Sequence, residues 1–194
     1  MTRLSATVAA AKRALRRCAL AQRGLLDAPE AAGAAAAHLL RAVDIAPGVT
    51  VAGYAAMRGE LDPRPALLAL EAKGCRTVLP HTTGRGEPLR FLAAPGGLAT
   101  STDALGIAAP PASAAEFDPD LLLVPLAAFD RRGYRLGYGG GFYDAALARL
   151  RAEGTITAVG WAFAAQEVEA VPAEPHDVRL DWIVTEREAI YISA

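Results

Sequence analysis

The sequence has 194 residues, 53% of them hydrophobic, which is enough to bury the core of one sizeable globular domain. Its 20 basic and 21 acidic residues give a formal net charge of −1, which excludes the broad basic surface of a nucleic-acid-binding or membrane-surface protein. The two cysteines, Cys18 and Cys75, form no CxxC pair, so neither a disulfide framework nor a structural zinc site is predicted.

The distribution of charged and apolar residues predicts a cytoplasmic protein. Lys12, Arg13, Arg16 and Arg17 interrupt the region where a signal peptide needs an apolar core. No run approaches the roughly 20 apolar residues that cross a membrane. We therefore expect a cytoplasmic monomer that binds neither membranes nor nucleic acid.

The first predicted element is an amphipathic helix from Leu4 to near Gly24, because apolar residues recur at steps of three and four. Its cations fall in two groups: Lys12, Arg16 and Arg23 lie along one flank of the apolar face, and Arg13 and Arg17 lie nearer the opposite pole. The flank can reach a cleft in the body of the protein. Spacing alone leaves this interpretation open and favours a solvated cationic face for all five residues.

A second helix and a strand–helix–strand unit follow. A helix is predicted to start at Asp27, Pro29 and Glu30 and to run to about Val43. Strands are predicted over 49–54 and 76–80. Between these strands a helix is predicted that Asp62 caps and Gly74 closes. This order implies a parallel pair with a right-handed crossover, in which ligands bind beyond the carboxyl ends of the strands. Residues 57–60 are therefore expected on the ligand side.

Residues 81–120 are rich in Gly, Pro, Ser and Thr and are predicted to form long connecting loops, with one short strand at 89–92. The remaining predicted elements are strands over 121–125, 156–163, 181–185 and 189–192, and a helix that begins near Asp144 and ends at Gly154. The alternation predicts an α/β fold, a single-domain three-layer sandwich over residues 1–194 in which helices flank a mostly parallel or mixed, Rossmann-like, doubly wound sheet.

A glycine-rich segment, RLGYGGGFYD at residues 135–144, separates the 121–125 strand from the helix. Strand, glycine loop and helix in this order aim backbone N–H groups and the helix dipole at an anion. Neither common phosphate-binding motif is present. The dinucleotide fingerprint needs Gly or Ala where Phe142 stands, and the P-loop needs Gly-Lys-Ser/Thr where Gly141 precedes Phe142 and Tyr143.

Carboxylates near this loop suggest a metal. Asp144 falls in the first turn of the helix, where a bound phosphate would repel it unless a Mg²⁺ ion lay between them. Alternatively, Asp144 only complements the helix dipole. A second metal ligand could be Asp177 or Asp181, and spacing does not choose between them. His176 could be a ligand or a base, although a lone histidine beside an acidic loop is more often a surface or packed residue.

Other residues of the loop have suitable chemistry for a nucleotide. Arg135 can meet phosphate oxygens. Tyr138, Phe142 and Tyr143 offer flat faces to a heteroaromatic ring, or they pack into the core.

The segment from Val124 to Asp144, VPLAAFDRRGYRLGYGGGFYD, resembles the signature of the 5-formyltetrahydrofolate cyclo-ligase family, also called methenyltetrahydrofolate synthetases. Other matches occur in the family's order: Lys12 and Arg16 four residues apart, Gly59-Glu60-Leu61-Asp62, Val171-Pro172, His176-Asp177 and Ile183-Val184-Thr185. The resemblance implies ATP- and magnesium-dependent conversion of 5-formyltetrahydrofolate to 5,10-methenyltetrahydrofolate with release of ADP and phosphate. In this reaction the formyl oxygen is phosphorylated and N10 attacks the activated carbon.

The resemblance also implies roles for individual residues. Lys12, Arg16 and Arg135 would be catalytic and would hold ATP phosphates, which favours the flank interpretation of the first helix. The other implied ATP-binding residues are Leu136, Gly137, Tyr138, Gly139, Gly140, Gly141, Phe142 and Tyr143. The implied folate-binding residues are Ala55, Met57, Glu60, Tyr138, Gly139, Gly140, Gly141 and Phe142, and the implied magnesium ligands are Asp144 and Asp177.

The sequence departs from the family pattern at three positions. Phe142 stands where many relatives have tyrosine, Leu89 replaces a frequent methionine, and Gly140 replaces a basic or polar residue. None of these removes a charge that the reaction needs. Two alternatives remain: a related ATP-dependent enzyme acting on another small N-formyl or amide substrate, and a non-catalytic folate- or nucleotide-binding homologue.

Overall fold

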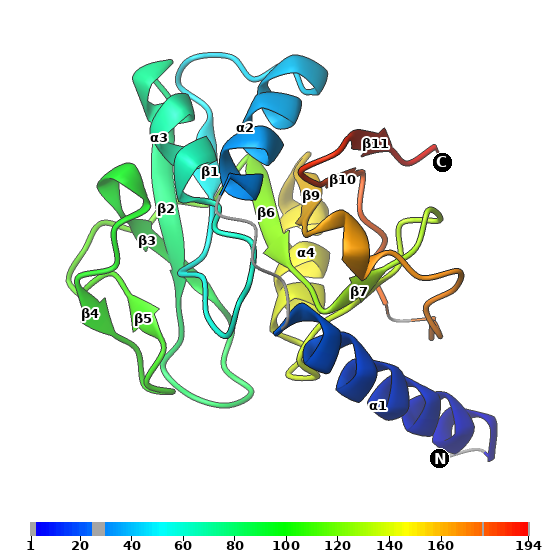
Figure 1. Cartoon of the computed structure of the whole chain (residues 1–194). Helices are drawn as coiled ribbons and strands as arrows, with labels where there is room; N and C mark the ends of the chain where they lie inside the picture. Colours follow the sequence, from blue (N-terminus) through cyan, green and yellow to red (C-terminus); the bar gives the residue numbers. More distant parts are fainter. Residues whose placement is uncertain (1–2, 25–29, 176, 194) are drawn as a thin grey trace.

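The structure of the protein is a computed structural model, which describes residues 3–24, 30–175 and 177–193. Helices cover both faces of a central sheet, with α2 and α3 on one face and α4 on the other (Figure 1). The helices are α1 (Arg3–Arg23), α2 (Ala31–Ala42), α3 (Arg64–Ala72) and α4 (Phe142–Glu153), with short 3-10 turns η1 (Pro95–Gly97) and η2 (Ala164–Gln166). The predicted three-layer α/β architecture is confirmed.

In the described part of the chain the central sheet has seven strands in the order β11-β10-β9-β6-β1-β2-β3. Their bounds are β1 (Thr50–Ala52), β2 (Arg76–His81), β3 (Arg90–Ala93), β6 (Leu121–Pro125), β9 (Thr157–Trp161), β10 (Trp182–Val184) and β11 (Ala189–Tyr191). The five inner strands are parallel, and the edge strands β3 and β11 are antiparallel to their neighbours. The predicted mostly parallel or mixed sheet is therefore correct, and β1 lies where the strand order reverses.

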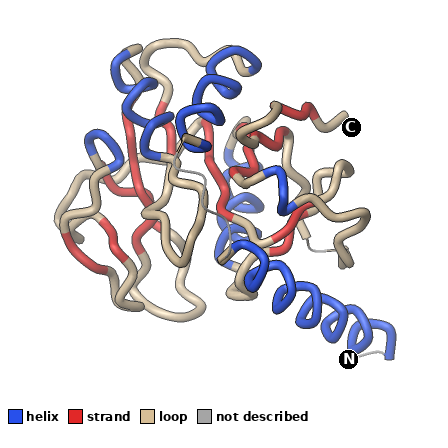
Figure 2. The backbone as a smooth tube through the Cα atoms, in the orientation of Figure 1, coloured by secondary structure: helices blue, strands red, loops and turns tan. Residues whose placement is uncertain are grey.

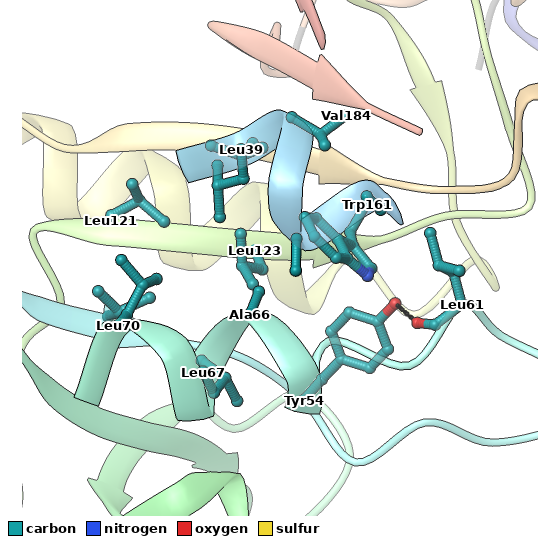
Figure 3. Close-up of a cluster of buried hydrophobic side chains, with 14 of the residues drawn as sticks. Leu39, Tyr54, Leu61, Ala66, Leu67, Leu70, Leu121, Leu123, Trp161 and Val184 are labelled. Carbon is teal, nitrogen blue, oxygen red and sulfur yellow. Dashed lines mark hydrogen bonds between the residues drawn. The ribbon is translucent and has the colours of Figure 1, made fainter. Parts of the chain in front are cut away.

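The core between the sheet and helices α2 and α3 explains the continuous apolar runs of the inner strands, because a parallel sheet is buried on both faces. Leu39 of α2, Leu67 of α3 and Leu123 of β6 meet there and are fully buried (Figure 3). At one end of this core the Tyr54 hydroxyl donates a 2.7 Å hydrogen bond to the carbonyl oxygen of Leu61. This bond joins the two ends of the loop that follows β1 and so shapes the segment that carries Glu60.

The connections differ from the predictions in detail. Residues 81–120 are mostly loop, as predicted, but besides β3 they contain a small antiparallel pair, β4 (Ser101–Thr102) and β5 (Ala108–Ala109) (Figure 2). A second small ribbon, β7 (Ala128–Phe129) with β8 (Arg135–Leu136), was not predicted. The glycine loop is therefore entered from β8 and not directly from the buried strand β6.

The predicted start of the second helix is tested only in part, because Asp27 and Pro29 lie outside the described residues. Glu30 occupies the N-cap position and makes no side-chain capping bond there, so the described helix begins after Glu30. At α3 the Asp62 carboxylate accepts a 2.9 Å bond from the backbone N–H of Arg64. Among the described residues no helix combines the length and apolar character needed to span a bilayer.

Candidate functional site

Helix α1 lies at the end of the sheet near β7 and η2, and its N-terminal half points away from the body (Figure 1). Its flank cations Lys12, Arg16 and Arg23 all contact residues of the body, whereas Arg13 and Arg17 are exposed. The alternative that all five cations form a solvated face is therefore wrong for the three residues of the flank and correct for the two residues of the opposite pole. The flank contacts three separate loops and so gathers them into one site.

Lys12 is held between two carboxylates of the segment that follows η2. Its Nζ lies 2.6 Å from Asp177 Oδ2 and 3.0 Å from Glu174 Oε2. Burial lowers the pKa of Lys12, but the hydrogen bonds that Lys12 donates to Asp177 and Glu174, together with their charges, outweigh it, so the pKa is raised above its ordinary value. Lys12 is therefore charged at neutral pH. Sequence reasoning missed Glu174, whose only signal was the acidic character of the 166–177 stretch.

Arg16 contacts the glycine loop directly. Its Nε donates a 2.7 Å hydrogen bond to the carbonyl oxygen of Gly137. A Cβ on Gly139 would stand 3.3 Å from the Arg16 guanidinium, and Gly139 has a φ of +95°, which other residues rarely adopt. A side chain at position 139 would therefore strain the backbone and crowd Arg16.

The turn into α4 also depends on glycine. Gly141, the N-cap of α4, has a φ of +71°, and a Cβ on Gly140 would lie 2.8 Å from the ring of Phe142. Gly139, Gly140 and Gly141 are exposed, and their N–H groups have no hydrogen-bond partner among the described residues. The loop thus presents free backbone donors beside the positive end of a helix, which is the arrangement expected for an anion site.

Arg135 pairs with one predicted metal ligand, Asp144, and also bonds the backbone next to the other, Asp177. Its side chain is 5% exposed, and its guanidinium donates to Asp144 Oδ1 at 2.7 Å and to the carbonyl oxygen of Val178 at 2.6 Å. Burial lowers the pKa of Arg135, and the charges of Asp144 and Asp177 oppose this shift. Both carboxylates therefore lie close to the same cation.

The structure distinguishes the candidate metal ligands. Asp144 pairs with Arg135, whose pKa the charge of Asp177 also raises, and the N–H of Val178, the residue after Asp177, donates to Asp144 Oδ1. Asp181 instead bonds Arg151 at 2.9 Å and the N–H of Ala158 at 2.7 Å, so it has a structural role in joining β10 to β9. Position 176 lies outside the described residues. Among those described, no cluster of three or more His, Cys, Asp or Glu side chains could hold a metal.

Glu60 closes a tight turn after β1. The N–H of Glu60 donates to the carbonyl oxygen of Met57, and the N–H of Met57 donates to Glu60 Oε2, both at 3.0 Å. The two central residues of the turn have positive φ, +50° for Arg58 and +74° for Gly59. The Glu60 side chain is only 4% exposed, and burial raises its pKa, opposed by the Met57 N–H and the Arg23 cation.

Tyr138 connects the glycine loop to this turn. The cations of Arg23 and Arg58 lie 5.5 and 5.9 Å from its ring centre, its hydroxyl accepts a hydrogen bond from Arg23, and Tyr138 opposes the rise in the pKa of Glu60 that burial causes. Tyr143, in contrast, is half-buried and packs against the core on the α4 side of the sheet, and its pKa is strongly raised by burial and by the charge of Glu60. Of the three aromatic residues, Tyr138 is the exposed one and Tyr143 points inward.

The other predicted residues lie around this centre. Ala55, Met57 and Phe142 are half-buried, and Leu136 is buried within the β7–β8 ribbon. A cavity of about 300 Å³ lies between α1 and η2. Its lining consists of Leu15, Cys18, Ala19, Gln22, Arg23, Ala165, Gln166 and Val168. None of the predicted ATP, folate or metal residues lines it, but Arg23 of the flank does, so it borders the candidate site.

Comparisons with known proteins agree with the sequence signature. The model of the 5-formyltetrahydrofolate cyclo-ligase family matches residues 8–186. The chain is 37% identical over 142 residues to the 5-formyltetrahydrofolate cyclo-ligase of Escherichia coli (strain K12), covering 70% of this chain and 77% of the relative. It is 34% identical over 150 residues to the 5-formyltetrahydrofolate cyclo-ligase of Mycolicibacterium smegmatis, covering 74% and 76%.

Two solved structures have the same fold. The NMR structure of Aquifex aeolicus 5,10-methenyltetrahydrofolate synthetase matches with a TM-score of 0.75 at 27% identity, covering 94% of this chain and 93% of that one. A 5,10-methenyltetrahydrofolate synthetase from Mycoplasma pneumoniae matches with a TM-score of 0.70 at 24% identity, covering 90% and 98%, and supports the fold alone.

Proposed function

Because this chain belongs to the 5-formyltetrahydrofolate cyclo-ligase family, we propose that it converts 5-formyltetrahydrofolate to 5,10-methenyltetrahydrofolate with MgATP and releases ADP and phosphate. The observation that carries the proposal is the meeting of the α1 flank with the glycine loop and the Glu60 turn. Through these contacts the cations of α1 and the backbone amides of the glycine loop lie beside the buried carboxylate of Glu60. A site that binds both ATP and a folate requires these two kinds of group side by side.

The ATP end of the site consists of Lys12, Arg16, Arg135 and the amides of the glycine loop. In this proposal the phosphates bind the loop N–H groups and draw Lys12 away from its two carboxylates. Phosphoryl transfer depends mainly on positioning and charge neutralisation, which fixed cations and amides provide. No covalent protein nucleophile is required.

Asp144 and Asp177 are the residues that would hold Mg²⁺. They fit because both provide carboxylate oxygens near Arg135, and Mg²⁺ is usually bound by one or two carboxylates together with phosphate oxygens and water. When bound, the ion would supply positive charge to the phosphates of ATP. Asp144 would then exchange part of its pairing with Arg135 for the metal, leaving Arg135 available to a phosphate.

The folate end consists of Ala55, Met57, Glu60 and Tyr138. A carboxylate can accept two hydrogen bonds from the aminopyrimidine edge of a pterin, and Glu60 is the carboxylate that lies beside the glycine loop. Its near-complete burial strengthens such bonds because little water competes for them.

The chemistry requires both ends together. The formamide carbon is a poor electrophile and its oxygen a poor leaving group at neutral pH. Transfer of the γ-phosphoryl group to that oxygen activates the carbon, N10 attacks it and releases its proton to water, and phosphate leaves with the C–O bond electrons. The role of the protein in this proposal is to hold the formyl oxygen in line with ATP and to neutralise the charge on the transferring group.

The test is to mix the purified protein with MgATP and 5-formyltetrahydrofolate and to follow methenyltetrahydrofolate absorbance and ADP together. We expect equimolar amounts of both products, and no product without ATP. Folded protein that binds either ligand, seen as thermal stabilisation, but yields no product would instead be the non-catalytic homologue. ADP formed only with another N-formyl or amide compound would indicate the related enzyme.

We also propose that residues 1–194 act as one domain and as a cytoplasmic monomer. A single copy provides all the candidate site residues, from Lys12 to Asp177, and the contacts between them span the chain. Cys18 and Cys75 are free thiols, consistent with a reducing compartment. Light scattering on the active protein tests the oligomeric state.

A further inference from the structure

Arg23, the last residue of α1, is a buried arginine next to the candidate site. Its side chain is 1% exposed. Its guanidinium donates to the carbonyl oxygen of Leu126 at 3.3 Å, to the carbonyl oxygen of Arg58 at 3.1 Å, and to the hydroxyl of Tyr138. One side chain therefore fastens α1 to the end of β6, to the Glu60 turn and to the glycine loop.

Stability alone does not explain an arginine at this position. Its Nε is buried and has no hydrogen-bond partner among the described residues. In the described part of the chain the carboxylate that pairs with its charge is Glu60, with 3.7 Å between Arg23 Nη1 and Glu60 Oε1, too far for a hydrogen bond. Burying a cation with an unpaired donor is unfavourable, and an apolar side chain of similar volume avoids this cost.

The first function of Arg23 is to brace the turn that carries Glu60. Arg58 has a φ of +50° and is the one non-glycine residue with positive φ in the described part of the chain. Such a conformation persists only when surrounding contacts hold it, and it is found preferentially at functional sites. The bond from Arg23 to the Arg58 carbonyl oxygen is one of these contacts.

The second function is to orient Tyr138. Because the Tyr138 hydroxyl accepts a hydrogen from Arg23, its own hydrogen remains available to the Glu60 carboxylate, whose pKa Tyr138 lowers. Arg23, Tyr138 and Glu60 are thus arranged so that a directed chain of hydrogen bonds can run from the guanidinium through the hydroxyl to the carboxylate. The Glu60 carboxylate is held from one side by the Met57 N–H and from the other by this chain.

We propose that Arg23 is a positioning residue for the folate substrate, which fixes the Glu60 carboxylate and Tyr138 from inside the protein. The inference rests on the proposed function, because it requires Glu60 to contact the folate. Lys12 and Arg16 hold their own partners earlier on α1 and do not contact the Glu60 turn. Loss of Arg23 should therefore weaken the binding of folate and leave that of MgATP nearly unchanged.

The experiment compares Arg23→Met, which keeps the aliphatic length, with Arg17→Met, an exposed arginine on the opposite side of the same helix. The KM for 5-formyltetrahydrofolate and the KM for MgATP are measured separately. We expect Arg23→Met to raise the folate KM about tenfold or more, the effect of one misplaced charge-assisted contact, and to change the ATP KM less than about threefold. Arg17→Met should match the wild type in both.

A double variant tests the hydrogen-bond chain itself. If Arg23 acts through Tyr138, Arg23→Met combined with Tyr138→Phe raises the folate KM by clearly less than the product of the two single effects. Multiplicative effects would overturn the chain through Tyr138.

The remaining outcomes separate the inference from the proposed function. Equal changes in both KM values, or none, would overturn the positioning role. An inactive wild type would refute the proposed function instead. If Arg23→Met does not fold, Arg23→Lys keeps the charge without the planar fork and should show the same raised folate KM. Failure of both variants to fold would assign Arg23 to stability and overturn the inference.

Discussion

Replacing Lys12 with methionine tests the cation that connects α1 to the segment after η2. Methionine keeps most of the aliphatic length and removes the charge. We expect kcat/KM for MgATP to fall at least about tenfold, the effect of losing one transition-state contact with phosphate. The KM for 5-formyltetrahydrofolate should change little, because Lys12 does not contact the Glu60 turn.

The effect on stability follows from the burial of the ion pairs. Lys12, Glu174 and Asp177 have side chains 14%, 19% and 17% exposed, so they lie between surface and fully buried pairs. Exposed pairs contribute about 0–1 kcal/mol, whereas breaking a buried pair costs about 3–5 kcal/mol. After allowance for solvent screening, we expect the free energy of unfolding at neutral pH to fall by about 1–2 kcal/mol.

The pH dependence of this loss has a definite sign. The pKa of Lys12 is raised in the folded protein above its ordinary value of 10.5. The stabilisation by Lys12 is therefore fully present below the pKa of the unfolded chain and disappears as the pH rises through the folded pKa. The stability difference between wild type and Lys12→Met should be constant from about pH 7 to 9 and should shrink above about pH 10.5.

The assay combines steady-state kinetics with urea unfolding at several pH values, with Arg13→Met as the matched control on the exposed pole of α1. A folded Lys12→Met variant with wild-type kinetics would remove Lys12 from the ATP site. A stability difference that grows above pH 10.5 would refute the ion-pair reasoning.

Three further outcomes are expected. Asp144→Asn should reduce turnover at least about tenfold at low Mg²⁺, with partial recovery as Mg²⁺ is raised, and full activity at every concentration would argue against a metal ligand. Glu60→Gln should raise the folate KM about tenfold. Burial raises the pKa of Glu60 in the folded protein. In urea unfolding, wild type should therefore gain stability relative to this variant as the pH falls through the folded pKa towards 4.5. Cys18→Ser and Cys75→Ala should keep wild-type turnover, whereas an inactive but folded variant would contradict a mechanism without a covalent nucleophile.

The elements that sequence reasoning predicted well are those defined by local pattern. The apolar run of β6 and the turn residues around β1 and β2 predicted buried parallel strands. β1 and β2 do pair in parallel, and Thr50 lies opposite Arg76. The β7–β8 ribbon was missed because each strand has two residues, too few for a periodicity. A tertiary contact holds it: fully buried Asp130 accepts bonds from the N–H groups of Arg132 and Val171, the latter 41 residues away.

The same limit applies to the candidate site. Helical periodicity placed Lys12, Arg16 and Arg23 on one flank, and all three contact the body. Periodicity could not identify their partners, because Glu174 and Tyr138 are more than 100 residues away in sequence. For the same reason spacing left Asp177 and Asp181 equivalent as metal ligands, and only the fold separates them.

The charges at the ATP end offset one another, and this bears on which form of ATP can bind. Among the described residues there, three cations, Lys12, Arg16 and Arg135, lie with three carboxylates, Asp144, Glu174 and Asp177. A free nucleotide polyphosphate would meet no net positive charge from these groups, and each of the two paired cations, Lys12 and Arg135, would leave a carboxylate behind on binding it. A divalent cation that arrives with the phosphates resolves this conflict, because the released carboxylates can then bind the metal. On this reasoning the internal ion pairs favour MgATP over ATP alone, which is why the Asp144→Asn effect should depend on the Mg²⁺ concentration.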